Sequence, residues 1–333
     1  MAEQAGNARP WLGDNGVDQP ERLGKAALAD ALARIEARPN APETTELLDA
    51  AYRDPKGHVI GVTGPPGVGK STLIAALIGA FRRRGESVGV IAVDPSSRRS
   101  GGALLGDRVR LDTDPDDQDV FVRSMAARDR LGGLASITSA AVVFMRSIFD
   151  HVIVETVGVG QSETDIASVA DSVVLCVQPG SGDSLQYMKA GIAEIPDIAL
   201  VTKADLGAVA KQTRRDLSSA LTTTGRSTGR KAEEGWQVPV LSIAVDDADG
   251  LSNLIDNIDR HRDHLWAGSL KARRLSQAKA WLTSAIEDAY GQEGLKLVRG
   301  WPDGLLLLED QSPFQRFSMI RNSLHQRITS SDL

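Results

Sequence analysis

Residues 64–71 restrict the possible folds of this chain more than any other part of its sequence. They read Gly-Pro-Pro-Gly-Val-Gly-Lys-Ser, directly after a run of β-branched residues and before a helical pattern of apolar residues. Glycines at this place let backbone amides approach phosphate oxygens closely, and the N-terminus of the following helix attracts the same anion. In such a phosphate loop the lysine pairs with β- and γ-phosphate oxygens and the serine ligates Mg²⁺. We assign the phosphate contacts to Gly64, Pro65, Pro66, Gly67, Val68, Gly69, Lys70, Ser71 and Thr72.

Short β-branched runs alternate with helical stretches from residue 57 to about residue 250. This alternation is typical of a mostly parallel sheet with helices on both faces, in which ligands bind at the carboxyl ends of the strands. The sequence therefore predicts an α/β fold of the P-loop NTPase type. The strands that it predicts are residues 58–63, 87–93, 151–155, 172–177, 198–202 and 238–243.

Composition excludes several classes of protein. The 38 basic and 44 acidic residues give a formal charge of −6, which does not favour binding to nucleic acid or to an anionic membrane. We find no secretory signal and no apolar run long enough to span a membrane. A single cysteine, Cys176, excludes an intramolecular disulfide and any multi-cysteine metal site. These features predict a cytoplasmic protein that binds neither nucleic acid nor membrane.

Two carboxylates are expected at the same edge of the sheet as the phosphate loop. Asp94 ends the second predicted strand, where it can hold Mg²⁺ or orient the attacking water, although the following Pro-Ser-Ser also makes it a good helix N-cap. Glu155 ends the third predicted strand and is placed as a second metal-directed carboxylate. The Gly158 amide beyond it can sense a γ-phosphate, unless this segment is only a strand followed by a turn.

The segment Thr-Lys-Ala-Asp at residues 202–205 predicts how the base is recognised. The stem of Lys203 can cover the plane of the base, and the Asp205 carboxylate can accept hydrogen bonds from guanine N1 and the 2-amino group. Adenine offers no such pair of donors, so the segment favours GTP over ATP. We count Ala244 among the nucleotide contacts as well.

Several longer strings resemble the MeaB/ArgK family of P-loop GTPases. Members of this family are chaperones of cobalamin-dependent acyl-CoA mutases and were once described as lysine/arginine/ornithine transport ATPases. The similarity extends over roughly residues 20–265. The strings that carry it are Ala-Val-Asp-Pro-Ser-Ser (92–97), Gly-Gly-Ala-Leu-Leu-Gly-Asp (101–107), Val-Glu-Thr-Val-Gly-Val-Gly-Gln-Ser-Glu (154–163) and Pro-Gly-Ser-Gly-Asp-Ser-Leu-Gln (179–186).

This resemblance implies roles for particular residues. Asp94 and Asp107 would lie in or beside the first switch and, with Ser71 and Glu155, around Mg²⁺. Lys70, Asp94 and Glu155 would form the catalytic group. Gln161 would belong to the switch and relay residues. A third mobile loop, residues 180–189, would relay the nucleotide state to the mutase through Asp183 and Lys189.

The resemblance also implies an architecture and partners. The fold would be the G3E/SIMIBI class shared with nickel-insertion GTPases, and the chain would form a homodimer through a C-terminal helical arm. GTP and GDP would be substrate and product. The partners would be a cobalamin-dependent acyl-CoA mutase, such as methylmalonyl-CoA mutase or a relative, and an adenosyltransferase. The regions that we expect are a disordered tail (1–17), a helical extension (18–56), the GTPase domain (57–250) and the dimerisation arm with its tail (251–333).

Three features depart from the family pattern. Thr202 stands where the family usually has Asn, which alters one polar contact to the base or the phosphate loop. Residues 122–133 differ from the Ser/Pro-rich family segment, and the tail from Gly291, which we expect to be less regular, matches no family string.

Two other functions fit parts of the sequence. A nickel- or zinc-insertion GTPase of the same fold would need a Cys/His-rich cluster, whereas this chain has one cysteine and five scattered histidines. An ATP-dependent kinase of a transport protein would transfer phosphate to a partner, and Asp205 argues against its use of ATP. Nucleotide affinity separates these readings.

Overall fold

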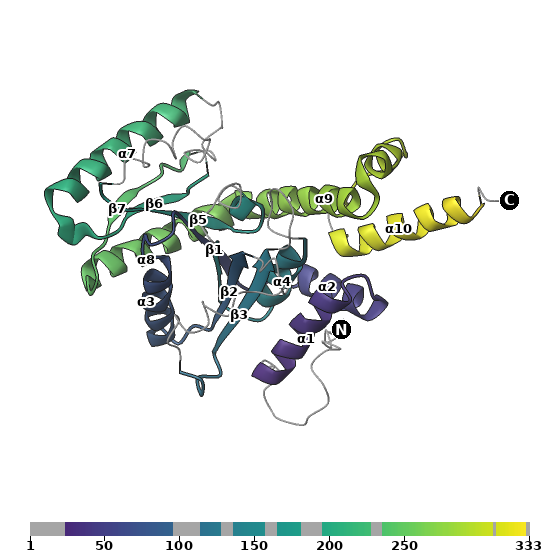
Figure 1. Ribbon diagram of the computed structural model, residues 1–333, viewed down its shortest axis with the longest axis horizontal. Helices are drawn as coiled ribbons and strands as arrows, with labels where there is room; N and C mark the ends of the chain where they lie inside the picture. The colour runs from purple at the N-terminus through teal and green to yellow at the C-terminus, as the bar shows by residue number, and fades with distance from the viewer. Residues whose placement is uncertain are drawn as a thin grey trace, which may run out of the picture.

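A computed structural model describes residues 24–95, 114–127, 136–156, 165–180, 195–227, 235–308 and 311–330. Within these residues the fold is α/β, as the sequence predicted, with one sheet between two layers of helices (Figure 1). No described helix has the length and apolar character that crossing a membrane requires.

The sheet has seven strands, and every pairing in it is parallel. The order across the sheet is β3-β2-β4-β1-β5-β6-β7, so β1 lies at the centre and all carboxyl ends form one edge. Both faces are covered, which is why the strands read as continuous apolar runs. The bounds are β1 His58–Thr63, β2 Val88–Pro95, β3 Val120–Ala127, β4 His151–Glu155, β5 Ser172–Val177, β6 Ile198–Val201 and β7 Val240–Ser242.

Strand β3 was missed in the sequence analysis, which expected six strands. It is an edge strand that pairs with β2 along its whole length, from Val120 with Val88 to Ala127 with Pro95. Arg123 interrupts its apolar pattern because this side chain leaves the sheet to form a two-pronged ion pair with Glu36, at 2.9 and 3.1 Å. A search for apolar runs therefore does not detect this edge strand, because polar residues interrupt its sequence.

Helices cover the two faces of the sheet in different groups. On one face, α3 and α8 share a hydrophobic core with the strands. On the other face, α1, α2 and α4 pack against β1, β2 and β4, and α7 covers β5 and β6. The bounds are α1 Lys25–Ala37, α2 Pro42–Arg53, α3 Lys70–Arg83, α4 Ser136–Arg146, α7 Ala208–Ser227 and α8 Ala248–His264, with short 3-10 turns η1 Ile166–Ser168 and η3 Ala204–Leu206.

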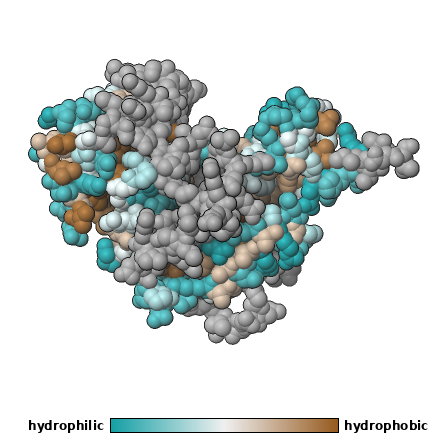
Figure 2. Space-filling view, viewed as in Figure 1, coloured by the Kyte–Doolittle hydropathy of each residue, from teal (hydrophilic) through white to brown (hydrophobic). Residues whose placement is uncertain are grey.

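The chain beyond α8 forms a helical arm that extends from the sheet (Figure 1). A π-helical turn, η5 Leu265–Ser269, leads into α9 Leu270–Arg299, and α10 Pro313–Ser330 packs back on it through Phe317, Ile320 and Leu324. The expectation of a less regular tail from Gly291 was therefore wrong. Gly291 is a kink within α9, with φ +67°, and not the end of the helix. Hydrophobic side chains gather on this arm and near the start of α7 (Figure 2).

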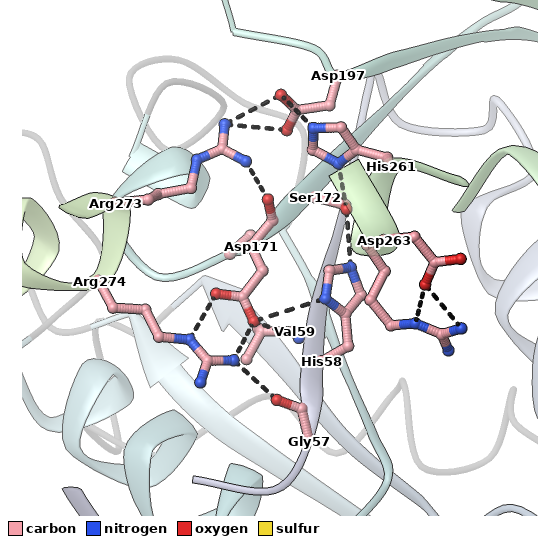
Figure 3. A network of polar contacts seen from close by, with 12 residues as sticks. Gly57, His58, Val59, Asp171, Ser172, Asp197, His261, Asp263, Arg273 and Arg274 are labelled. Atoms are coloured by element: carbon pink, nitrogen blue, oxygen red, sulfur yellow. Dashed lines mark hydrogen bonds and ion pairs between the residues drawn. The ribbon is translucent and has the colours of Figure 1, made fainter. Parts of the chain in front are cut away.

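A buried polar network attaches the arm to the amino ends of the strands (Figure 3). Arg274 donates to both oxygens of Asp171, at 2.6 and 2.9 Å, and Arg273 donates to both oxygens of Asp197, at 2.9 and 3.2 Å. Both carboxylates stand immediately before a strand, so the start of α9 is held at the edge of the sheet opposite the phosphate loop.

Candidate nucleotide site

The phosphate loop joins the end of β1 to the start of α3 at the centre of the carboxyl edge. Gly64 has φ +140°, and a Cβ on it would come within 2.2 Å of the carbonyl oxygen of Cys176, so only glycine fits there. Gly69 caps α3 in a left-handed conformation, φ +103°. Val68 is fully buried beneath the loop. These constraints give the loop the path of an anion-binding turn with the N-terminus of α3 pointing at it.

The structure brings the predicted site residues Ser71 and Glu155 into contact, next to Lys70 at the start of α3. The ammonium of Lys70 donates to the carbonyl oxygens of Gly64 and Pro65, at 2.8 and 3.2 Å, so it lies across the mouth of the loop. The hydroxyl of Ser71 donates to Glu155 Oε1 at 3.1 Å. Oxygen donors are what Mg²⁺ prefers, so this hydroxyl and carboxylate fit the ion that the sequence implies.

Lys203 connects the base-reading segment to the phosphate loop. It adopts the left-handed conformation, φ +51°, which is uncommon for a residue other than glycine and is fixed by the Ala204 amide bonding to Ile243 O at 3.0 Å. Its ammonium donates to Gly67 O and to Gln178 Oε1, each at 3.0 Å. The lysine stem therefore lies along the site, where it can cover one face of a base.

Gln178 is a site residue that the sequence analysis missed. It directly follows β5, whose neighbours β1 and β6 carry the phosphate loop and Lys203. Thr202, by contrast, is buried, and its hydroxyl donates to Val177 O at 3.3 Å. The glutamine therefore supplies a side-chain acceptor to Lys203, and the threonine hydroxyl is turned into the sheet.

A cavity of about 650 Å³ joins the phosphate loop to the segment after β7. This volume suits a nucleotide-sized ligand. Ala244 lines the cavity, while Asp247 caps α8 by accepting from the Gly250 amide at 2.8 Å. Asp205 is exposed in η3, two residues beyond Lys203, and is not part of the lining. The predicted nucleotide contacts that do line it are Gly67, Val68, Gly69, Thr72, Lys203 and Ala244.

The remaining predicted residues are placed in part or not at all. Asp94 is the second-last residue of β2, so its backbone lies at the carboxyl edge, but its side chain lies outside the description. Five others lie outside the described residues: Asp107, Gly158, Gln161, Asp183 and Lys189. Among the residues that are described, no group of three or more His, Cys, Asp or Glu side chains is arranged to hold a metal ion.

Cys176 lies directly behind the phosphate loop. It is fully buried, and this burial raises the pKa of its thiol to about 12, against the opposing field of Lys70. The thiol therefore stays neutral and acts as a small apolar side chain under Gly64.

Comparison with known proteins matches most of this chain. A sequence model of the family described as "Methylmalonyl Co-A mutase-associated GTPase MeaB" matches residues 28–295. The chain is 38% identical over 273 residues to a "Probable GTPase" of Mycobacterium tuberculosis, covering 80% of each protein. It is 35% identical over 233 residues to the "Methylmalonic aciduria type A homolog, mitochondrial" of Mus musculus, covering 69% of this chain and 55% of that protein.

A solved structure has a similar fold. The crystal structure of a protein named "LAO/AO transport system kinase" superimposes with a TM-score of 0.62 at 29% sequence identity, covering 84% of this chain and 83% of that one.

Proposed function

The chain belongs to the MeaB family of methylmalonyl-CoA mutase-associated GTPases, and from this premise we propose that it binds and hydrolyses GTP. We further propose that this cycle gates the loading or protection of the cofactor of an adenosylcobalamin-dependent acyl-CoA mutase. Methylmalonyl-CoA mutase or a relative is the partner that the family description supports.

One observation carries the GTP proposal. The ammonium of Lys203 bonds to Gly67 O of the phosphate loop, so the base-reading segment and the phosphate loop border one cavity. A triphosphate seated on the loop would extend its base along the stem of Lys203 toward η3. Asp205, exposed in that turn, would accept from guanine N1 and the 2-amino group.

The chemistry follows from groups that are already in position. When a triphosphate enters, Lys70 exchanges its two carbonyl acceptors for β- and γ-phosphate oxygens and neutralises the charge that develops there. Ser71 and Glu155 would hold Mg²⁺, which supplies further charge neutralisation when bound. We include Asp94 as the carboxylate that holds Mg²⁺ or orients the attacking water, because β2 ends at the same edge.

The partner would read the nucleotide state through segments that follow these strands. Asp107, Gly158 and Gln161 are the proposed switch residues, and Asp183 and Lys189 the proposed relay to the mutase. An adenosyltransferase is proposed as a further partner. If the relay is correct, Asp183→Ala lowers the effect of GTP on mutase binding and leaves GTP binding itself unchanged, and an unaltered mutase response would refute it.

We also propose a homodimer through the arm. Four exposed apolar side chains support it, because such residues on an extended arm are typical of a surface that a second copy covers. They are Leu297, Leu306, Leu308 and Met319, each at least half exposed. Light scattering of the full chain tests this proposal, and a monomer mass would overturn it.

The decisive experiment on nucleotide choice compares GTP, GDP, ATP and XTP by isothermal titration calorimetry. We expect GTP and GDP to bind well and ATP poorly. Asp205→Asn should lower GTP affinity about 10- to 100-fold, because it removes a hydrogen bond to a charged acceptor, and should raise affinity for XTP.

Asp216→Asn is the matched control, since Asp216 is an exposed aspartate on α7 that is hydrogen-bonded to Gln212, away from the cavity. Its GTP affinity should equal that of the wild type. Tight ATP binding with transfer of phosphate to a protein partner would instead favour a kinase, and unchanged GTP affinity in Asp205→Asn would show that the base reader has been misassigned.

A further inference from the structure

Three guanidinium groups lie near the amino edge of the sheet, that of Arg146 buried and those of Arg273 and Arg274 partly buried, and two carboxylates are paired with them. Arg273 forms its ion pair with Asp197, and Arg274 with Asp171 (Figure 3). The third guanidinium, that of Arg146 at the end of α4, takes part in none of the ion pairs between described residues. Counted over the described residues, the cluster therefore holds one more positive than negative charge.

Arg146 is also the most deeply buried of the three. Its side chain is 4% exposed, and its Nε has no hydrogen-bond partner in the part of the chain that is described. Its guanidinium lies 5.8 Å from the centre of the Tyr52 ring, a contact that satisfies no N–H donor. Burial lowers the pKa of Arg146 to about 10, the field of Arg274 acts in the same direction, and those of Asp171 and Tyr52 oppose it. The group is still cationic at neutral pH.

A cavity of about 30 Å³ is lined in part by Arg146. Such a volume holds an ion of the size of chloride or one to two waters. Tyr52 and Ser139 also line the cavity, and each carries a hydroxyl that can donate a hydrogen bond. Burial raises the pKa of the Tyr52 phenol, which keeps its proton on and available to a ligand. The polar residues of the lining are thus two arginines, Arg146 and the ion-paired Arg274, and four neutral residues, Tyr52, Ser139, Ser168 and Gln277.

We propose that this cavity is a binding site for a small monovalent anion, of which chloride is the probe. An unpaired buried cation is expensive in free energy, and a single negative charge at this place would balance the cluster. A multivalent anion would overcompensate the single surplus charge. Water alone would satisfy the Nε donor but leave the surplus charge in place.

The position of the site gives the anion a structural role. Its walls come from the helical extension (Tyr52), from α4 (Ser139 and Arg146), and from the arm (Arg274 and Trp281). Trp281 also bonds through its indole N–H to Ser136 O at 2.8 Å, which brings α9 against the start of α4. A bound anion would therefore help to fix the arm on the body of the molecule, independently of any nucleotide.

The test uses the full chain without nucleotide, melted in sodium gluconate and in sodium chloride or bromide at constant ionic strength. We expect the halides to raise the melting temperature by about 2–4 °C. Arg146→Met should abolish this difference. Arg123→Met, which removes a guanidinium already paired with Glu36, should keep it, and non-specific salt effects cancel in this comparison. An equal halide response in both variants, or no response of the wild type, would overturn the proposal.

A second measurement does not depend on the variants folding. Crystals of the wild type grown in sodium bromide should show an anomalous peak beside the Arg146 guanidinium. A water in that position, with bromide absent, would overturn the proposal. Both experiments omit GTP, so their failure leaves the proposed GTPase function untouched.

Discussion

The two edges of the same sheet are built on opposite principles. At the carboxyl edge, β1, β5 and β6 end in the phosphate loop, Gln178 and Lys203, around a cavity of about 650 Å³. At the amino edge, the same strands begin at His58, beside Asp171 and beside Asp197, where side chains are buried and ion-paired. At the carboxyl edge, polar groups border a cavity of the size of a nucleotide, whereas at the amino edge the charged groups are ion-paired with each other.

This difference assigns stability and function to different ends of the strands. Buried ion pairs lose much when one partner is removed, because the other charge is then left in a low-dielectric interior. Groups that face a cavity can be substituted with little effect on folding, because water solvates what remains. Substitutions at the two edges should therefore separate into those that unfold the chain and those that only disable it.

The largest expected effect is on stability and comes from Arg274→Ala. It leaves the Asp171 carboxylate buried without its strongest partner, so the free energy of unfolding should fall by about 3–5 kcal/mol, as measured by urea denaturation. Arg38→Ala is the matched control, because its pair with Glu43 is exposed and should contribute less than about 1 kcal/mol. If the free energy of unfolding falls equally in the two variants, the amino-edge ion pair contributes no more to stability than an exposed one.

At the opposite edge, Lys70→Ala should leave the fold intact and remove the activity. The rate of GTP hydrolysis should fall about 10²- to 10³-fold, because one charge that stabilises the γ-phosphate is lost. Lys211→Ala, on the exposed surface of α7, should hydrolyse GTP at the wild-type rate. A circular-dichroism melt checks the fold, and a large drop in the melting temperature of Lys70→Ala would mean that this lysine serves the core instead.

Acidification should weaken the amino edge through its buried histidines. Burial lowers the pKa of His58 to about 3 and that of His261 to about 4, each against the field of a nearby aspartate. Between pH ~6.5 and ~4 the unfolded chain binds these protons and the folded chain does not. As the pH is lowered through this range, the free energy of unfolding therefore decreases by about 1.4 kcal/mol per pH unit for each histidine.

Asp171 does not act in the same window. Burial alone would raise its pKa, but the hydrogen bonds and field of Arg274 outweigh that and bring it to about 2. Its contribution is therefore lost only below pH ~3.8. Urea denaturation at pH 7 and pH 5 measures the slope, and His261→Gln should reduce it. If the slope is the same in this variant, His261 is not a source of the effect.

Local sequence patterns predicted the carboxyl edge far better than the amino edge. The phosphate loop and the base-reading segment are each contiguous, so both can be recognised as motifs in the sequence. The amino-edge network joins Asp171 to Arg274 over 103 residues and Asp197 to Arg273 over 76 residues. Acidic and basic residues at such separations form pairs only because the fold brings them together, and no local motif marks them.

Two elements were missed for different reasons. Strand β3 carries Arg123 in its middle, and that residue makes sense only once α1 supplies Glu36. Helix α10, in contrast, could have been predicted from the sequence, because its apolar residues recur at helical spacing on one buried face. These residues are Phe314, Phe317, Ile320 and Leu324. Gln178 was missed for the same reason as β3, because its role depends on the fold, in which β5 lies between β1 and β6.

The smallest expected effect comes from Gln178, and it sharpens the comparison at the carboxyl edge. Its Oε1 is one of two acceptors that hold the Lys203 ammonium, and the other, Gly67 O, belongs to the backbone. Gln178→Leu keeps the volume and removes the acceptor, so Lys203 should lose its fixed position. We expect GTP affinity to fall about fivefold, corresponding to about 1 kcal/mol, with the melting temperature unchanged.

Gln178→Glu is the matched variant, because a carboxylate accepts from the same ammonium and should preserve the position of Lys203. Its GTP affinity should therefore stay at or near that of the wild type, while Gln178→Leu alone loses affinity. If both variants bind GTP equally well, Gly67 O suffices to hold the lysine. If both lose affinity to the same extent, Gln178 acts through its amide N–H donors, because glutamate lacks these donors as leucine does.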